Sequence, residues 1–251
     1  MAKLLSVQNL NKSFLFEGQK VLVLKDISLE VEEKEFVSII GPSGCGKSTL
    51  LELLSGITKP DSGKIFYREQ DVTGQAGKAG YMPQDDLLFP WLTLLDNVLL
   101  PCKIKHTDIS VSRQKALNLL PDFGLEGYAQ HLPWQLSGGM KQRAAFLRTV
   151  MSEADILLLD EPFANLDALT RLQMQGWLHG IRKKLGLTIV LVTHDIDEAI
   201  RLADVIYVMD SNPGTLIYKE KVPEVLHQDG NDVTYPLWSK LKTRLLHKLL
   251  P

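Results

Sequence analysis

A glycine-rich segment near the N-terminus has the residue types and the spacing needed to bind a row of phosphate groups. Two glycines separated by four residues precede a lysine and a serine, and background residue frequencies produce this pattern by chance in about 1% of chains of this length. Glycines let the backbone turn its N–H groups toward phosphate oxygens, and a helix that follows adds the positive end of its dipole. The candidate binding residues are Gly41, Pro42, Ser43, Gly44, Cys45, Gly46, Lys47, Ser48 and Thr49.

Two side chains of this segment carry its charge and metal chemistry. Lys47 would neutralise charge on the β- and γ-phosphates of a nucleoside triphosphate, and the Ser48 hydroxyl would ligate Mg²⁺. The alternative is a glycine-rich turn that binds nothing. We favour the phosphate site because residues 36–40 form an apolar run typical of a strand, and the leucines of 47–55 predict a buried helix.

Acidic and imidazole side chains follow two further apolar runs. Ile156–Leu159 is followed by Asp160 and Glu161, and His194 follows the predicted strand 187–192. Ligands of an open parallel sheet bind beyond the carboxyl ends of its strands, so these side chains should lie near the phosphate segment. Asp160 would then hold Mg²⁺ through a water, Glu161 would be the general base, and His194 would contact a γ-phosphate oxygen. Taken alone, two acids after a strand more often mark a loop, and a lone histidine is more often structural.

A second anion site is predicted where Ser137 precedes two glycines. Ser137 is a good N-cap for a helix that runs to about Met151, and Gly138 and Gly139 would leave its first N–H groups uncovered. The alternative is a capped helix carrying two glycines that each cost about 1 kcal/mol of helix propensity. Close approach to a phosphate is a reason to accept that cost.

The elements that must position these residues alternate between strand and helix. Such alternation predicts an α/β fold whose mostly parallel sheet has helices on both faces. Between residues 86 and 151 the pattern is helical and interrupted by prolines, which indicates short helices in a separate layer. The strands are expected at 21–24, 27–31, 36–40, 65–67, 156–159, 187–192 and 205–209, and the helices at 47–55, 169–184 and 196–202.

Composition excludes several classes of protein. With 45% hydrophobic and 23% charged residues, the 251-residue chain is neither disordered nor fibrous. A net charge of −2 gives no bulk attraction to nucleic acid, so no nucleic-acid partner is expected. Two cysteines indicate a reducing compartment. The apolar runs are far shorter than the ~20 residues of a membrane span and the N-terminus does not resemble a signal peptide, so we expect the chain in the cytosol.

Taken together and in this order, the motifs resemble the nucleotide-binding subunit of an ATP-binding cassette (ABC) importer. The resemblance covers about residues 3–215 and rests on 41–49, Gln84, 136–143, 156–161, 164–167 and His194. It implies a P-loop NTPase core with an N-terminal antiparallel β subdomain and an inserted helical subdomain. It also implies two copies packed head to tail, with each ATP between the phosphate loop of one copy and Ser137–Gly139 of the other.

The resemblance assigns roles to further residues. Gln84 would contact Mg²⁺ and water and sense the permease, and Asp167 would join the two sites across the dimer. Phe14 would stack on adenine, with Phe16 as runner-up and a plain core role as the alternative for both. Two positions depart from the family pattern: Lys34 stands where glycine is frequent, and residues 164–167 read Ala-Asn-Leu-Asp where Ser-Ala-Leu-Asp is frequent.

Residues 84–98 resemble the corresponding stretch of the nitrate, sulfonate and taurine importer group. Leu88, Phe89, Trp91 and Leu92 would be exposed there and form an apolar groove wall for a permease helix, unless they pack inward. Cys45 lies among backbone dipoles that should lower the pKa of its thiol.

Two domains are expected: a nucleotide-binding domain at 1–219, with its helical subdomain at about 86–151, and a helical C-terminal extension at 220–251. The extension carries apolar residues at helical spacing and could rest on its own domain, a partner subunit or a membrane surface. These residues are Trp238, Leu241, Leu245, Leu246 and Leu249.

The function implied is that of an ATP-hydrolysing subunit, using ATP and Mg²⁺, that powers a separate transmembrane permease. A second nucleotide-binding subunit, expected to be an identical copy, and indirectly a solute-binding protein would be its other partners. Its place would be the cytoplasmic face of the cell membrane, as a peripheral subunit. The alternative is a soluble ABC ATPase outside transport, for example in iron–sulfur assembly, whereas a small-molecule kinase would not explain residues 136–140.

Overall fold

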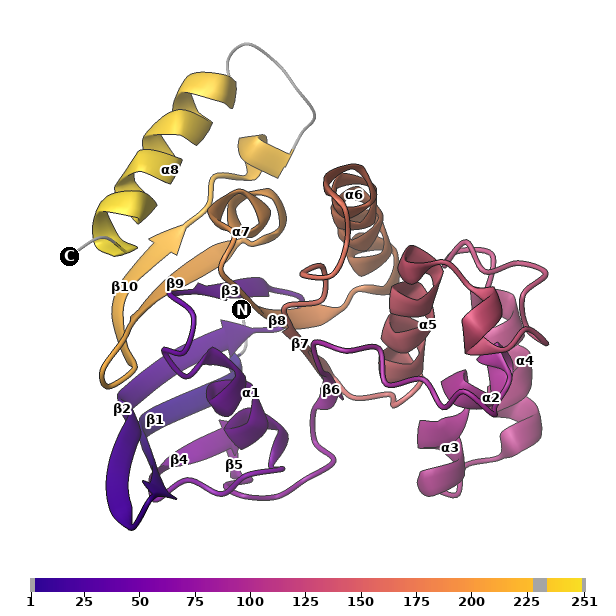
Figure 1. The fold of residues 1–251 in the computed structure, drawn as a ribbon, viewed down its shortest axis with the longest axis horizontal. Coiled ribbons are helices and arrows are strands. Elements are labelled where there is room, and N and C mark those ends of the chain that lie inside the picture. The colour runs from indigo at the N-terminus through magenta and orange to yellow at the C-terminus, as the bar shows by residue number, and fades with distance from the viewer. Residues whose placement is uncertain (1–2, 228–233, 250–251) are drawn as a thin grey trace.

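The computed structural model describes residues 3–227 and 234–249, which form two sheets with helices around them (Figure 1). One sheet is antiparallel and has the strand order β2-β1-β4-β5. The other is mainly parallel and has the order β10-β9-β3-β8-β7-β6, with β10 antiparallel to β9 at its edge. The first sheet comprises β1 (Lys3–Phe16), β2 (Gln19–Glu32), β4 (Ser62–Tyr67) and β5 (Gln70–Asp71). The second comprises β3 (Phe36–Ile40), β6 (Gly80–Met82), β7 (Ile156–Asp160), β8 (Thr188–Thr193), β9 (Val205–Asp210) and β10 (Thr215–Lys221).

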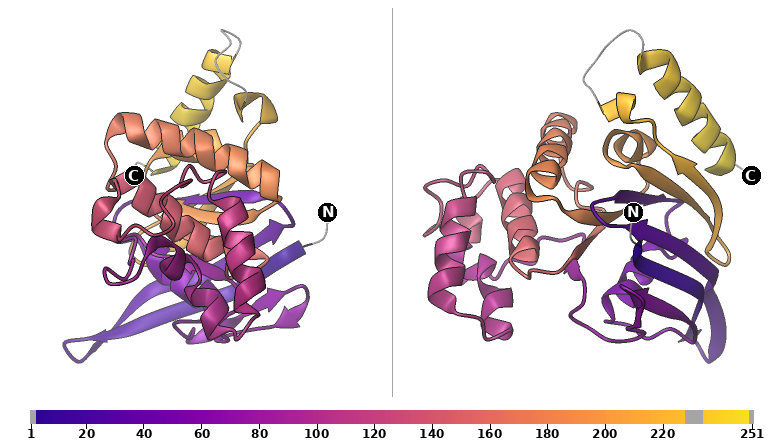
Figure 2. Two further views of the ribbon diagram at one scale, coloured as in Figure 1. Left: turned by 90° about the vertical axis from the view of Figure 1, so that its right-hand side faces the viewer. Right: turned by 180° about the vertical axis from the view of Figure 1, so that it is seen from behind.

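Helices cover both faces of the parallel sheet, as predicted. The α-helices are α1 (Lys47–Ser55), α2 (Leu94–Val98), α3 (Leu100–Ile104), α4 (Ile109–Leu119), α5 (Gly138–Val150), α6 (Ala168–Leu185), α7 (Ile196–Leu202) and α8 (Thr234–Leu249). Two short 3₁₀ helices, η1 (Pro133–Gln135) and η2 (Glu224–His227), complete the helices of the described ranges. Figure 2 shows the helical segment α2–α5 and the C-terminal helix α8 at opposite sides of the molecule.

The central strands are apolar on both faces because each face packs against a different layer. In β7, Leu157 and Leu159 belong to the core shared with α5, α6 and α7. Ile156 and Leu158 point to the other core, which contains α1 and the antiparallel sheet. Near-continuous apolar runs are expected for parallel strands covered on both sides. The runs that looked like strands in the sequence are therefore the ones buried at the centre.

Most of the predicted elements are confirmed, and the main differences lie among the strands. The strands expected at 21–24 and 27–31 are one continuous strand, β2, paired along its length with β1. The short strand β6 was not predicted. Strand β10 was not predicted, because it is an exposed edge strand with alternating polar residues. It also spans the domain boundary expected between residues 219 and 220.

Lys34 adopts the conformation for which glycine is the ordinary residue. Its φ is +63°, in the left-handed region. Its N–H donates to the Thr188 hydroxyl at 2.8 Å, and its carbonyl accepts from Arg182 Nη2 at 2.7 Å. The turn before β3 is therefore kept by contacts with β8 and α6 although the residue is not glycine.

Helix α8 packs on its own domain, which answers where the C-terminal extension rests. Leu241 and Leu245 are buried in the core that includes α7. The Trp238 indole donates to Asp197 Oδ1 at 3.1 Å, and Lys242 Nζ donates to Asp197 Oδ2 at 2.6 Å. None of the helices in the described part of the chain has the length and apolar character that crossing a membrane requires.

One carboxylic acid is buried inside the helical face of the sheet. Glu198 lies on the inner side of α7, and Gln175 Nε2 of α6 is 3.5 Å from its Oε2. Burial, together with the nearby charge of Asp195, raises the pKa of Glu198 to about 8. Its carboxyl group is therefore mostly protonated at neutral pH.

This burial predicts a specific pH dependence of stability. Between the ordinary glutamate pKa of about 4.5 and the folded value of about 8, the folded chain holds a proton that the unfolded chain has lost, so stability falls as pH rises. Glu198→Gln, which mimics the protonated acid, should remove this part of the slope. We expect the variant to match the parent near the lower pH and to exceed it in free energy of unfolding near the upper one.

Denaturant unfolding at a series of pH values measures the effect. Glu17→Gln, at an exposed position of the β1–β2 turn, is the matched control and should keep the parental slope. Identical slopes for Glu198→Gln and the parent would contradict the assignment of a protonated buried acid.

Candidate active site

The glycine-rich segment forms the loop between β3 and α1. Gly44 and Gly46 have φ values of +77° and +103°, which L-residues with side chains rarely adopt. Gly41 is required for a different reason, because a Cβ atom there would lie 2.6 Å from the carbonyl oxygen of Met209. Helix α1 starts with no side-chain cap and no acid in its first turn. Its first N–H groups and the positive end of its dipole are therefore available to an anion.

Lys47 is held inside this loop. Its side chain is 5% exposed, and its ammonium donates to the carbonyls of Gly41 and Pro42 at 2.9 and 3.0 Å. Its Nζ also lies 3.9 Å from Glu161 Oε1. The ammonium therefore lies between the phosphate loop and the end of β7.

Asp160 is tied to two hydroxyl groups at the end of β7. Ser48 donates to its Oδ1 at 3.0 Å, and Tyr81 donates to its Oδ2 at 3.2 Å. Burial raises the pKa of this carboxyl group, although the hydrogen bonds from Ser48 and Tyr81 lower it. Sequence reasoning missed Tyr81 because it comes from β6, whose strand was not predicted; its position shortly before Gln84 was the available signal.

The donor atoms around Asp160 fit a magnesium ion. Ser48 is an exposed residue whose hydroxyl donates to the Asp160 carboxylate, and both side chains offer the hard oxygen ligands that Mg²⁺ uses. Over residues 3–227 and 234–249, no three His, Cys, Asp or Glu side chains are grouped as a metal site. Two protein oxygens suit an ion that takes its other ligands from phosphates and water.

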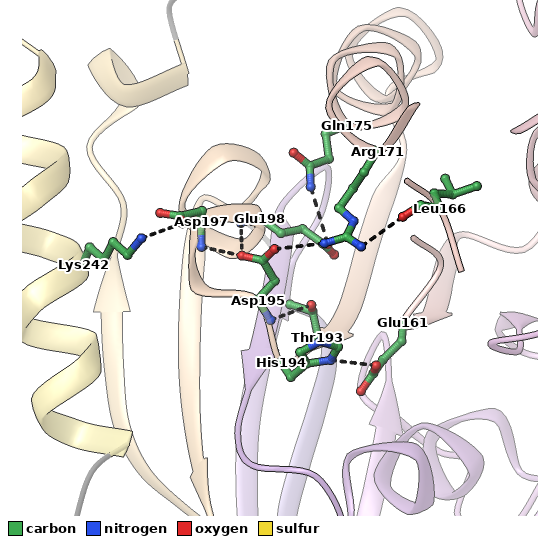
Figure 3. A network of polar contacts seen from close by, with 10 residues as sticks. All are labelled: Glu161, Leu166, Arg171, Gln175, Thr193, His194, Asp195, Asp197, Glu198 and Lys242. Atoms are coloured by element: carbon green, nitrogen blue, oxygen red, sulfur yellow. Dashed lines mark hydrogen bonds and ion pairs between the residues drawn. The ribbon is translucent and has the colours of Figure 1, made fainter. Parts of the chain in front are cut away.

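Glu161 and His194 lie together at the same edge of the sheet (Figure 3). Glu161 Oε2 is 2.8 Å from His194 Nδ1, and the Glu161 N–H donates to the carbonyl of Val192 at 3.0 Å. The φ of Glu161 is +42°, a strained value for a residue with a side chain. This backbone turn directs the carboxylate toward both Lys47 and His194.

The remaining candidates lie elsewhere in the chain. Among the described residues, no hydrogen bond or ion pair joins Ser137–Gly139 to the phosphate loop, and Figure 1 shows α1 and α5 on either side of β6 and β7. Ser137 caps α5 by accepting from Met140 N at 3.3 Å. Gly139 also has a packing role, because a Cβ there would lie 3.3 Å from the Thr170 methyl group.

Asp167 caps α6, and its carboxylate accepts from Thr170 N at 3.1 Å. The Thr170 hydrogen bonds lower the pKa of Asp167.

Gln84 is exposed in the loop after β6. Phe14 is 40% exposed with Lys12 Nζ 5.0 Å from the centre of its ring, and Phe16 is more exposed still. The alternative in which either phenylalanine is an ordinary core residue is therefore wrong.

Two further expectations are also wrong, the lowered thiol pKa of Cys45 and the exposure of Leu88. The Cys45 side chain is 3% exposed, and burial raises the pKa of its thiol by more than Lys47 and the loop amides lower it. Leu88 is buried against the helical core. Phe89 and Trp91 are exposed as expected, and Leu92 is half-buried.

Comparison with known proteins shows the family of the chain. Residues 24–164 match the family described as ABC transporter. The chain is 42% identical over 213 residues to the taurine import ATP-binding protein TauB of Pseudomonas aeruginosa, covering 85% of this chain and 81% of that protein. It is 46% identical over 191 residues to the formylaminopyrimidine import ATP-binding protein ThiZ of Halalkalibacterium halodurans, covering 76% and 74%. For the aliphatic sulfonates import ATP-binding protein SsuB of Bacillus subtilis the identity is 39% over 216 residues, covering 86% and 83%.

The fold is likewise similar to that of solved ATP-binding cassettes. A dimeric post-hydrolysis state of the cassette MJ0796, bound to ADP and Pi, superposes with a TM-score of 0.76 at 33% identity, covering 87% of this chain and 99% of that one. Because the family match spans more than half of the chain and the relatives align over most of it, the chain belongs to the ABC transporter family and is one of its ATP-binding, ATP-hydrolysing subunits.

Proposed function

We propose that this subunit hydrolyses Mg²⁺-bound ATP as a head-to-tail pair of identical copies and thereby drives import through a separate permease. The observation that carries the proposal is the convergence of Lys47, Glu161 and His194 at one edge of the sheet, beside a loop built for phosphate. The relatives named for import of taurine, aliphatic sulfonates and formylaminopyrimidine support a small solute of this kind, in the nitrate, sulfonate and taurine class or related to it.

Within one copy, the loop and the strand ends divide the work of hydrolysis. The loop amides and Lys47 bind the β- and γ-phosphates. Ser48, together with Asp160 through a water, would hold Mg²⁺, and this ion would supply further neutralisation of phosphate charge. Glu161 accepts the proton of the attacking water, as a general base must. His194, hydrogen-bonded to Glu161 and otherwise exposed, keeps that carboxylate oriented and contacts the γ-phosphate. Phe14 stacks on adenine.

The second copy completes the site. Ser137–Gly139 at the start of α5 present N–H groups to the γ-phosphate of the opposite copy, where they stabilise the charge of the transition state. Asp167 contacts the opposite copy beside this position, and Gln84 would contact the Mg²⁺ and the attacking water. The separation of α5 from α1 within one chain supports a site shared between two chains.

The permease contact is proposed at Phe89 and Trp91. Their rings lie 5.2 Å apart, and the Trp91 side chain is 72% exposed. Asn97, which is fully buried, fixes this loop by accepting from Phe89 N at 2.7 Å and donating to the carbonyls of Phe89 and Leu92. A preformed apolar surface of this kind suits a helix of a membrane subunit, which would place the chain at the cytoplasmic face of the membrane. The solute-binding protein would contact the permease rather than this chain.

Replacement of the proposed base tests the hydrolytic mechanism. Glu161→Gln keeps the shape of the side chain but cannot accept the proton, so turnover should fall by about 100-fold or more. ATP should still bind, and the ATP-bound dimer should accumulate on size-exclusion chromatography. Glu153→Gln, at an exposed glutamate outside the site, is the control. Parental turnover in Glu161→Gln would contradict the base assignment.

Mixing two inactive variants tests the shared site. A Lys47→Ala copy lacks a working phosphate loop and a Ser137→Arg copy lacks a working α5 start, so each should be inactive alone. A mixed dimer contains one site built from two intact halves. Random pairing makes half of the dimers mixed, so about a quarter of the sites should be restored. Measured ATPase activity that stays at the level of the single variants, with both variants folded and paired, would rule out the shared site.

The permease surface is tested with Trp91→Ala. Loss of a buried interface tryptophan commonly costs about 2 kcal/mol, or roughly 30-fold in affinity. Co-purification with the membrane subunits and transport should both fall, whereas ATP hydrolysis by the isolated subunit should be unchanged. Tyr235→Ala, an exposed aromatic on α8 at the other side of the molecule, should change neither. Parental permease binding by Trp91→Ala would contradict this docking site.

A further inference from the structure

One arginine bridges the two loops that carry the proposed catalytic pair. Arg171 lies in the first turns of α6, and its Nη2 donates to the Leu166 carbonyl at 3.0 Å. Its Nη1 is 3.8 Å from Asp195 Oδ2. Leu166 belongs to the loop between β7 and α6, which starts at Glu161, and Asp195 directly follows His194. Figure 3 shows the guanidinium between these two partners.

The Asp195 side of the bridge is itself rigid. Asp195 N donates to the Thr193 hydroxyl at 3.0 Å. Its Oδ1 caps α7 by accepting from the N–H groups of Asp197 and Glu198 at 2.9 and 3.2 Å. Oδ2 is left to face Arg171. The position of Asp195 is therefore fixed by β8 and α7. The contact of Arg171 with Asp195 consequently restrains the backbone beside His194.

The guanidinium also borders the space directly behind the catalytic pair. A cavity of about 20 Å³ is lined by Glu161, Arg171, His194 and Glu198, among others. A cavity of this size holds one water at most, so the Glu161 carboxylate, whose side chain is only 19% exposed, has little room to retreat while Arg171 is in place. Removing the guanidinium would enlarge this space and free the loop that starts at Glu161.

We propose that Arg171 is a positioning residue for ATP hydrolysis, which locks the loop carrying Glu161 and Asp167 to the loop carrying His194. The proposal rests on the roles proposed above for Glu161 and His194. Arg171 contacts no residue of the phosphate loop within the described contacts, so its loss affects the hydrolytic step and leaves ATP binding intact. A planar fork serves two acceptors at once, which the single ammonium of a lysine does less well.

A role confined to the stability of α6 has a different signature. The Arg171 side chain reaches away from its own helix, to a loop carbonyl and to the cap of α7. If it served α6 alone, its loss would lower the melting temperature and weaken ATP binding and turnover together, in proportion to the folded fraction. If Arg171 is a positioning residue, its loss should lower kcat but leave ATP affinity unchanged.

The test compares Arg171→Met with Lys183→Met, which removes the same charge from an exposed position farther along α6. We expect kcat of Arg171→Met to fall on the order of 10-fold or more, as small misplacements of reacting groups do, with ATP affinity and melting temperature near parental values. Arg171→Lys should be intermediate, and Lys183→Met should resemble the parent. Parental kcat in Arg171→Met, or equal losses of binding and turnover, would overturn the proposal.

A double variant separates the bridge from independent effects. Asp195→Asn keeps an N-cap for α7 but loses the charge that faces Arg171, so its kcat should fall as well. The double variant Arg171→Met/Asp195→Asn should be no slower than Arg171→Met alone, because both changes break one connection. If the kcat losses of the two single variants add in the double variant, the bridge is overturned. If Arg171→Met fails to fold, the kcat values of Arg171→Lys and Asp195→Asn test the bridge instead.

Glu161→Gln in the same assay keeps this proposal distinct from the one on which it rests. Parental turnover in Glu161→Gln would overturn the catalytic assignment and the positioning role with it. An inactive Glu161→Gln beside a fully active Arg171→Met would overturn the positioning role alone.

Discussion

The buried ammonium of Lys47 sets the requirements that the surrounding elements meet. A desolvated charge is costly unless it is paired and hydrogen-bonded, and here the carbonyls of Gly41 and Pro42 accept from it while Glu161 lies 3.9 Å away. The same loop contains Gly44 and Gly46 at positive φ, a conformation that residues with side chains rarely adopt. Phosphate oxygens, being charged, are stronger acceptors than carbonyls. A triphosphate can therefore take the place of these partners without leaving the lysine uncompensated.

The sequence best predicted those elements whose ends are marked by local residues, such as a cap or a glycine. Helix α7 was predicted at its observed limits because Asp195 is a cap at its start, and α1 is bounded by Gly46 and Gly56, both in left-handed conformation. The buried strands β3 and β7 were equally clear from apolar runs. The signals were weaker for β6 and β10, because a three-residue strand and an exposed edge strand owe their conformation to pairing with a neighbour.

The candidate site was predictable in outline for the same topological reason. Asp160, Glu161 and His194 end or follow parallel strands, so the carboxyl edge of the sheet brings them to the phosphate loop. Features that depend on burial in the tertiary structure were not predictable from the sequence. The raised pKa of Cys45 and the burial of Leu88 come from neighbours distant in sequence. The Tyr81 hydrogen bond to Asp160 and the Arg171 bridge likewise join residues that no local pattern relates.

The first turn of α7 connects the catalytic edge with the C-terminal extension. Asp195 faces Arg171, whereas Asp197, two residues later, accepts from Trp238 and Lys242 of α8. Both acids also complement the positive end of the α7 dipole. The Lys242 ion pair is partly exposed and contributes little by itself, so burial of Leu241 and Leu245 is the larger contribution of α8. Apolar packing therefore holds α7 from the outside, while a charged bridge holds its start from the side of the catalytic loops.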